Sequence, residues 1–255
     1  MYWPVNLMEH EIVIYFQAYP EQQAGLVHQA YPEQQAGPEH EAGKARLQHR
    51  LGRSLLKKAL AKEYQIDFTE EMISYADNGK PLLKNVNDRA SVFFNISHCE
   101  GMVVCALADC PIGIDVEGSR RVTDSLIRSA CSDWEKTYVA AGGANGRTGR
   151  FLELWTLKES YLKMTGEGMR LPVDRISFQF SEAVKPETES CRLKAGLCKP
   201  EDVSCKPENG RWRTPSEIQS SREGCYYQTL VNDRYVLAVC AKEFCKEPRL
   251  VVAEL

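Results

Sequence analysis

The amino-acid sequence predicts an α+β protein of two similar α/β lobes, because a helix-like stretch is followed by β-rich stretches in each half of the chain. The length of 255 residues is enough for one large domain or two small ones. We place an N-terminal lobe at residues 1–112 and a C-terminal lobe at 113–255. Within the first lobe, residues 1–43 are poorly defined.

A duplicated segment occupies much of this start. QAYPEQQAG occurs at 17–25 and again at 29–37. Its proline, glycine and glutamine residues offer little that builds a core, so we expect a loop or frayed turn without a catalytic role.

The first strong helix prediction covers residues 44–62. Leucines recur at every fourth position, which is the spacing of one buried helix stripe. Such a helix has a second stripe beside the first, and here it is basic. It consists of Arg46, Arg50, Arg53 and Lys57.

A turn and three β-rich runs follow this helix. NGKP at 78–81 is typical of a tight turn. The runs at 91–97 and 101–109 are split only by HCE, so we expect two paired strands. PIGIDVE at 111–117 predicts a third, short strand.

The second half of the chain repeats the order of helix and then strands. Residues 122–141 and 150–166 predict helices, with a loop at 142–149 between them and a glycine stop at Gly166. The remaining expected elements are a strand at 175–181, weak strands and long loops across 182–224, and a hairpin at 226–242 around Asn232 and Asp233.

Composition and charge argue against several classes of protein. A net charge of −3 is too small to indicate nucleic acid or a membrane surface as the partner. No apolar run is long enough for a membrane span, and the N-terminus lacks the basic start and cleavage site of a secretory signal. The ten cysteines include no CxxC pair, so we expect reduced thiols in a cytoplasmic protein.

The end of the PIGIDVE strand carries two carboxylates. Residues i and i+2 of a strand point to the same side, so Asp115 and Glu117 are directed at the same space. Like charges this close are costly unless a cation lies between them, and Mg²⁺ prefers oxygen ligands. A solvated strand end is the alternative interpretation.

The helix at 150–166 places further charged groups in an apolar series. Glu159 and Lys163 are four residues apart, and Trp155 lies on the same face. Glu159 would add a third carboxylate to a metal site, and Lys163, one turn further on, would reach a phosphate held there. The alternative is an ordinary Glu–Lys pair on the helix.

Four motifs in one order resemble a known family. GKP at 79–81, FNISH at 94–98, GIDVE at 113–117 and LWTLKESYLKMTGEGMRLP at 154–172 are similar to the signature of 4′-phosphopantetheinyl transferases of the surfactin-synthetase-activating type. Each motif alone is weak, but four in this order are highly specific. The resemblance covers residues 44–180 well and the last hairpin loosely.

The resemblance implies two pseudo-symmetric lobes with coenzyme A and Mg²⁺, or Mn²⁺, in the cleft between them. It also implies transfer of the phosphopantetheine arm of coenzyme A to a serine of an apo acyl or peptidyl carrier protein, with release of 3′,5′-ADP. Asp115, Glu117 and Glu159 would be the metal ligands, and Lys163 would contact the pyrophosphate. Two fused lobes also imply that a monomer suffices.

The resemblance further places residues around the distal end of the coenzyme. His98 with Ser97 would meet the 3′-phosphate, and Lys80 of the GKP turn would lie on the same nucleotide side. Lys158 belongs to the coenzyme-binding motif without a defined role. Arg46 and Arg50 share the expected nucleotide position, and the spacing of the basic residues does not decide between them.

The general base and one substitution are less defined by the resemblance. Glu135 in CSDWEK occupies the place of a family glutamate that would deprotonate the carrier serine, directly or through a metal-bound water; Glu159 is the competing candidate. Cys99 stands where the family commonly has serine or threonine, so a hydroxyl contact to phosphate would be lost.

Two other functions fit parts of the same pattern. A Mg²⁺-dependent phosphohydrolase would use three carboxylates and a lysine equally well. A relative that only binds carriers would have no need of three carboxylates directed at one point. The sequence does not distinguish fatty-acid, polyketide, nonribosomal-peptide or lysine-pathway carriers.

Overall fold

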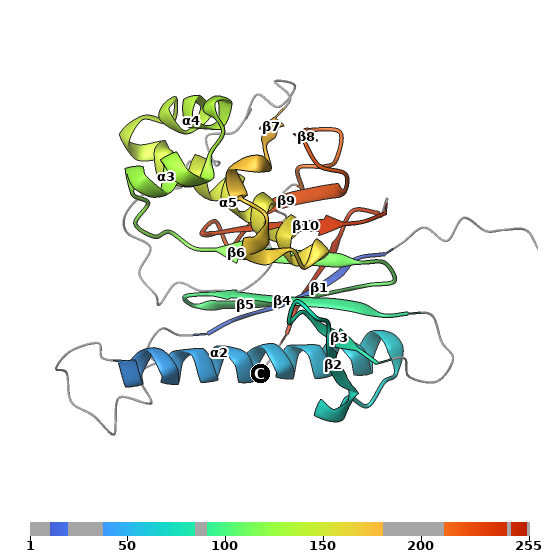
Figure 1. Cartoon of the computed structure of the whole chain (residues 1–255). Helices are drawn as coiled ribbons and strands as arrows, with labels where there is room; N and C mark the ends of the chain where they lie inside the picture. The colour runs from blue at the N-terminus through green and yellow to red at the C-terminus, as the bar shows by residue number, and fades with distance from the viewer. Residues whose placement is uncertain (1–10, 20–37, 85–90, 181–211, 244–245, 254–255) are drawn as a thin grey trace, which may run out of the picture.

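The computed structural model describes residues 11–19, 38–84, 91–180, 212–243 and 246–253. They form four layers, in which a long helix and a group of three helices enclose two β-sheets (Figure 1). This mixture of helices and sheets confirms the predicted α+β class. In these ranges, no helix has the length and apolar character needed to cross a membrane.

The first sheet comprises β1 (Val13–Ala18), β4 (Phe93–Cys99), β5 (Met102–Ala108) and β11 (Arg249–Val252), in the order β11-β1-β5-β4. β4 and β5 are antiparallel and confirm the predicted strand pair. β5 also pairs antiparallel with β1, whereas β11 runs parallel to β1. β4 and β11 are therefore the two edges of the sheet.

Helix α2 (Pro38–Ala59) covers the outer face of this sheet and confirms the predicted basic helix. It continues as a π-helical turn, Leu60–Tyr64. The leucine stripe packs on the sheet, because Leu55 is fully buried and Leu51 is half-buried. The duplicated segment begins in β1, but its residues 20–37 lie outside the described residues.

A short hairpin carries the NGKP turn beside α2. A 3₁₀ turn, Glu70–Met72, leads into β2 (Ile73–Tyr75), which pairs antiparallel with β3 (Pro81–Leu83). Gly79 has φ of 81°, a backbone conformation that glycine adopts without a steric penalty. The turn predicted from NGKP is confirmed.

The second sheet comprises β6 (Ile112–Glu117), β9 (Cys225–Val231) and β10 (Tyr235–Ala241), in the antiparallel order β6-β10-β9. β9 and β10 confirm the predicted hairpin. Asn232 and Asp233 at its tip have φ of 53° and 50°, the left-handed pair that a tight two-residue turn requires.

A two-stranded ribbon lies beside the helices of the second half. β7 (Phe178–Phe180) pairs antiparallel with β8 (Ile218–Ser220). β7 is shorter than the predicted strand at 175–181, because Val173–Arg175 forms a 3₁₀ turn. Residues 181–211 of the predicted loop region lie outside the described residues.

The prediction of one helix over 122–141 is wrong. The structure has two helices there, α3 (Asp124–Ala130) and α4 (Asp133–Ala140). Cys131 is extended, and Ser132 starts the second helix because its hydroxyl accepts from the backbone amide of Glu135 while the Glu135 carboxylate accepts from that of Ser132. Such a reciprocal capping pair is a strong helix start.

The predicted loop at 142–149 is also wrong, because α5 (Gly143–Thr165) includes most of it. Arg147 in this added part forms an ion pair with Asp124 of α3, and Gly149 is buried. Tertiary packing thus outweighs the low helix propensity of three glycines. The glycine stop is confirmed, since Gly166 follows the helix with φ of 75°.

The two sheets are joined at β4 and β6 by side chains instead of a backbone ladder. Asn95 Oδ1 accepts from the Ile114 amide at 2.9 Å, and Ser97 Oγ accepts from the Val116 amide at 3.4 Å. Both polar residues are buried. Asn95 and Ser97 of FNISH therefore provide hydrogen-bond acceptors for two backbone amides at the free edge of β6. These bonds fix the carboxylate-bearing strand against the first sheet.

An apolar core fills the space between the sheets. Its members include Ile14, Phe16, Met102, Val104, Ile112, Ile114, Val116, Leu237 and Val239. The predicted lobe boundary falls at the first residue of β6. The prediction assigned β11 to the C-terminal lobe, but this strand pairs with β1 in the first sheet. The division at residue 112 stays a prediction.

Replacing Gly113 by alanine is expected to lower the free energy of unfolding by about 3 kcal/mol. A Cβ at Gly113 would overlap the carbonyl oxygen of Ser160 and the amide nitrogen of Met164, because α5 lies directly on β6 there. Chemical denaturation measures the change. Gly146→Ala is the control: nothing lies within 4 Å of its added Cβ, so a gain of up to about 1 kcal/mol is expected. Equal stabilities of the two variants would contradict this packing.

Candidate active site

β6 delivers both carboxylates of the DVE motif to the side of the sheet that faces α5. Ile114 and Val116 point into the core between the sheets, so Asp115 and Glu117 point the opposite way. Asp115 is only 5% exposed, and Glu117, nearer the strand end, is half-buried. The prediction that the two acids share one space is confirmed by the strand geometry.

Lys163 of α5 and Ser97 of β4 converge on Asp115. Lys163 Nζ lies 2.6 Å from Asp115 Oδ1 and 2.8 Å from Ser97 Oγ. Ser97 in turn donates to the same Asp115 oxygen at 2.9 Å. Three elements distant in sequence therefore meet at one carboxylate oxygen.

The second oxygen of this carboxylate has no protein donor. Asp115 Oδ2 is buried and accepts no hydrogen bond from the described residues. A buried carboxylate oxygen without a partner costs free energy unless a cation or donor satisfies it. This oxygen is the atom of the site that most clearly lacks a ligand.

Glu117 is held by Arg120, which was not predicted from the sequence, and by Trp155, which shares a helix face with Glu159 and Lys163. Arg120 lies 3.1 Å from Glu117 Oε1, and the Trp155 indole donates to the same carboxylate. Arg120 also stacks over the Trp155 ring, 5.4 Å from its centroid. Burial and the charge of Asp115 nevertheless raise the pKa of Glu117 to about 7.

Glu159 faces the same group of charges from α5. Burial and the nearby Asp115 carboxylate raise its pKa, while Lys163 and Arg120 lower it. Across the described ranges, however, no three His, Cys, Asp or Glu side chains are grouped closely enough to hold a metal ion as they stand. Asp115 is instead paired with Lys163, and Glu117 with Arg120.

Ser97 and His98 point to opposite faces of β4, as neighbours on a strand must. Ser97 is bonded within the Asp115 cluster, and its contact with the 3′-phosphate, predicted together with that of His98, stays a prediction. His98 is exposed, and partial desolvation together with the Lys163 charge lowers its pKa. His49 of α2 also lowers that pKa, which places it near His98.

The basic stripe of α2 is divided. Arg46 and Arg50 are both exposed, and no described acid forms an ion pair with either. Arg53 contacts Glu70 at 3.7 Å and lies near Tyr75. The structure therefore leaves Arg46 and Arg50 equally available to an anionic ligand, as in the sequence analysis.

Glu135 and Lys158 form a buried ion pair away from Asp115. Lys158 Nζ lies 2.7 Å from Glu135 Oε2 and donates to the Ala130 carbonyl at 2.5 Å. Glu135 also accepts from the Phe178 amide, and its side chain is 0% exposed. The prediction of Glu135 as general base is contradicted by this geometry, because a fully buried and fully bonded carboxylate cannot reach a substrate hydroxyl.

Replacing Lys158 by methionine is expected to lower the free energy of unfolding by about 3–5 kcal/mol, because Glu135 would keep an unpaired buried charge. Thermal and chemical denaturation measure the loss. Lys136→Met is the matched control, since it breaks an exposed pair with Asp133 and should change stability little. A Lys158→Met variant as stable as that control would show that the buried pair has no structural role.

Lys80 is bonded to the main chain of β6 and α5. Its ammonium donates to the main-chain carbonyls of Met164 at 2.7 Å and Ile112 at 3.3 Å. Burial lowers its pKa to about 8. Two of its three N–H groups are thus already used by the protein, and contact with a 3′-phosphate stays a prediction.

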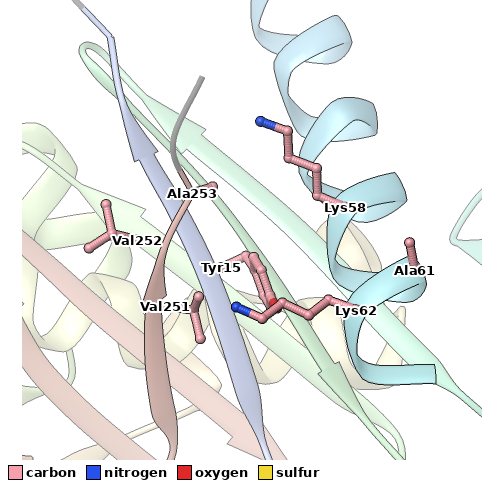
Figure 2. A pocket seen from close by; sticks show the side chains of 7 residues that line it. All are labelled: Tyr15, Lys58, Ala61, Lys62, Val251, Val252 and Ala253. Carbon is pink, nitrogen blue, oxygen red and sulfur yellow. The ribbon is translucent and has the colours of Figure 1, made fainter. Parts of the chain in front are cut away.

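A groove of about 730 Å³ lies at the β11 edge of the first sheet, opposite the edge formed by β4. Figure 2 shows Lys62 reaching toward Tyr15 across it. Its lining consists of Tyr15, Lys58, Ala61, Lys62, Val251, Val252 and Ala253. None of these is a predicted site residue, so the groove is separate from the carboxylate cluster.

The part of the chain that carries this cluster matches a known family. A sequence profile of the 4′-phosphopantetheinyl transferase superfamily matches residues 111–240, a range that includes β6 and α5 with their carboxylates. The chain belongs to this superfamily. The recognition made from the four motifs is confirmed.

Characterised relatives of this transferase extend the match beyond that range. It is 29% identical over 192 residues to the 4′-phosphopantetheinyl transferase Sfp of Bacillus subtilis (strain 168), covering 75% of this chain and 72% of the relative. A second B. subtilis 4′-phosphopantetheinyl transferase is 30% identical over 198 residues, covering 76% and 75%. The L-aminoadipate-semialdehyde dehydrogenase-phosphopantetheinyl transferase of Xenopus laevis is 28% identical over 141 residues, covering 51% and 47%.

Two residues of the transferase site were not predicted from the sequence. Arg120 lies three positions after Glu117, and in the sequence it looks like an ordinary surface residue. Only the structure shows its ion pair with Glu117. Asn95 looks like a strand residue of no special role, yet it positions β6. A polar residue inside an apolar strand was the available signal for Asn95, whereas nothing in the local sequence singles out Arg120.

No disulfide joins the cysteines that the structure of the transferase describes. They are Cys99, Cys105, Cys110, Cys131, Cys225 and Cys240. Burial raises the pKa of Cys99 to about 12, so this residue next to the carboxylates carries a protonated thiol. A cytoplasmic location stays a prediction.

Proposed function

We propose that Asp115, Glu117 and Glu159 hold one divalent cation, and that Lys163 faces the pyrophosphate of coenzyme A. The enzyme transfers the 4′-phosphopantetheine arm of coenzyme A to a serine of an apo carrier protein, and the other product is 3′,5′-ADP. The observation that carries the proposal is the buried Asp115 oxygen without a partner, among two further carboxylates of raised pKa.

The residues present fit Mg²⁺ or Mn²⁺. The donors are carboxylate oxygens from a strand and a facing helix, and three of them leave positions for water and phosphate oxygens. When bound, Mg²⁺ supplies positive charge for the pyrophosphate oxygens and for the leaving phosphate. Lys163 and Arg120, which now pair with Asp115 and Glu117, are the cations that a metal ion would replace and free for the phosphates.

Glu159 is the residue best suited to take the proton of the carrier serine. Its side chain is only half-buried and faces the Asp115 cluster from α5, so a substrate hydroxyl can approach it. Glu135, the other candidate for general base, is excluded because its carboxylate is fully buried. Lys163 remains near the reacting phosphate and stabilises the charge that develops there.

The coenzyme would lie across the β4–β6 junction, between the two predicted lobes. His98 and one of Arg46 and Arg50 would meet its 3′-phosphate, since all are exposed and cationic when protonated. The acceptor is an acyl or peptidyl carrier of fatty-acid, polyketide or nonribosomal-peptide synthesis. The enzyme acts as a monomer in the cytoplasm, without nucleic acid or a membrane as partner.

The experiment is incubation with coenzyme A, Mg²⁺ and an apo carrier protein, followed by intact mass. We expect the carrier to gain one phosphopantetheine, with none gained by a carrier whose acceptor serine is alanine. Consumption of coenzyme A while the wild-type carrier keeps its apo mass would establish the phosphohydrolase instead. If the protein binds the carrier but leaves coenzyme A and the carrier unchanged, it is a relative that binds carriers without enzymatic activity.

A further inference from the structure

The NGKP turn reaches across to the elements that carry the active site. Besides the two bonds of Lys80, the Asn78 side-chain amide donates to the Gly166 carbonyl at 2.7 Å. Asn78 Oδ1 accepts from the backbone amide of Lys80 at 3.1 Å, so the Asn78 side chain also holds the backbone of the turn at Lys80. The β2–β3 hairpin is thereby attached to both α5 and β6.

Two of the three carbonyls lie at the C-terminal end of α5. The last carbonyls of a helix have no partner within the helix, and the helix dipole is negative there. Lys80 supplies a positive charge and a donor to Met164, and Asn78 supplies a donor to Gly166 just beyond the helix. The pair therefore acts as a cap delivered from another part of the chain.

The third carbonyl belongs to Ile112, the first residue of β6. At the next residue, Gly113, α5 and β6 are in backbone contact. Lys80 thus bonds to both partners of one crossing, which we call the α5–β6 junction and define by Ile112, Gly113 and Met164. Met164 follows Lys163 directly, and Asp115 lies on the same short strand.

We propose that Lys80 and Asn78 are positioning residues, which hold the α5–β6 junction and so set the distance between Lys163 and Asp115. Lys80 then serves the placement of the reacting groups and does not select for the 3′-phosphate. Among the described residues no carboxylate forms an ion pair with Lys80, and the partners that it does have are main-chain carbonyls. The proposal rests on the proposed transfer reaction.

The test compares coenzyme A with dephospho-coenzyme A, which lacks only the 3′-phosphate. Lys80→Met and Asn78→Ala are measured with both substrates, and His98→Ala serves as the contrast for a residue on the phosphate side. Lys84→Met is the matched control, because Lys84 also donates to a main-chain carbonyl, that of Glu71, but is remote from the junction. Each variant is characterised by kcat and KM for both substrates and by thermal unfolding.

Lys80→Met is expected to lower kcat about 10- to 100-fold with both substrates, since small misplacements of reacting groups have effects of this size. The ratio of kcat/KM for the two substrates should stay at the wild-type value, and Asn78→Ala should give the same pattern with a smaller loss. Lys84→Met should match wild type. His98→Ala should instead reduce the ratio.

A Lys80→Met variant that keeps its kcat and loses its preference for coenzyme A would overturn the proposal. If that variant does not fold, Asn78→Ala decides: a lower kcat at constant preference supports the junction, and wild-type kinetics contradicts it. A wild-type enzyme that modifies no carrier would refute the proposed function instead. The role of Lys80 at the junction would then be judged by thermal unfolding alone. We expect a lower melting temperature for Lys80→Met than for Lys84→Met, and equal melting temperatures would contradict this role.

Discussion

Replacing Asp115 by asparagine is expected to lower kcat/KM for transfer by about 100-fold or more. The substitution keeps the size of the side chain but removes the negative charge that Lys163 and the proposed metal ion share. An amide nitrogen in place of either oxygen would also present hydrogen atoms to cations. The rate of mass gain by the carrier protein measures the effect.

The control for this variant is Asp174→Asn, which removes an equal charge from the exposed 3₁₀ turn at Val173–Arg175. It should transfer at the wild-type rate. Both variants should keep the wild-type circular dichroism spectrum, since an asparagine side chain retains the shape of the aspartate that it replaces. Wild-type activity of Asp115→Asn would remove this residue from the reaction.

Replacing Lys163 by methionine is expected to lower kcat by about 100- to 1000-fold, with a smaller change in KM. The ammonium lies 2.6 Å from Asp115 Oδ1, and under the proposed function it faces the phosphate on which charge develops. An interaction that strengthens in the transition state affects kcat more than binding. Steady-state kinetics with a saturating carrier protein separates the two constants.

Lys242→Met is the matched control for Lys163→Met, because Lys242 is exposed and follows β10 away from the cluster. Lys163→Arg tests the geometry, since a planar guanidinium does not replace a compact ammonium without loss. An equal rise in KM with unchanged kcat for Lys163→Met would show that this lysine binds the coenzyme without acting on the reaction.

Local patterns predicted those parts of the fold that local forces determine. The alternation of PIGIDVE placed Asp115 and Glu117 on one side of a strand, and the spacing of Glu159 and Lys163 placed them on one face of a helix. Both placements agree with β6 and α5. The Asn232–Asp233 turn was predictable because its residues favour the left-handed conformation that they adopt.

Long-range contacts account for what the sequence did not predict. The glycine-rich start of α5 is joined to α3 by the ion pair of Arg147 with Asp124. Glu135 is enclosed together with Lys158, which pairs with it from α5. β11 returns to β1, and Arg249 at its start is bonded to Glu63 after α2 at 2.7 Å. No period or propensity within a short window encodes such partners.

The position of Lys80 illustrates the same limit within the active site. Its motif indicates a nucleotide-binding turn, and the motif gives no sign of the two main-chain carbonyls that its ammonium contacts. Similarly, Ser97 and His98 are neighbours in FNISH but point to opposite faces of β4, and only Ser97 is bonded to Asp115, although the charges of Asp115 and Lys163 also act on His98.

The most direct test of a single metal site on Asp115, Glu117 and Glu159 is a Mn²⁺ titration followed by electron paramagnetic resonance, in the presence of coenzyme A. Wild-type enzyme is expected to bind one Mn²⁺ per chain. Asp115→Asn, Glu117→Gln and Glu159→Gln should each weaken this binding by about tenfold or more, while Asp174→Asn binds as wild type does. Full-affinity binding of one Mn²⁺ by all three carboxylate variants would contradict the account.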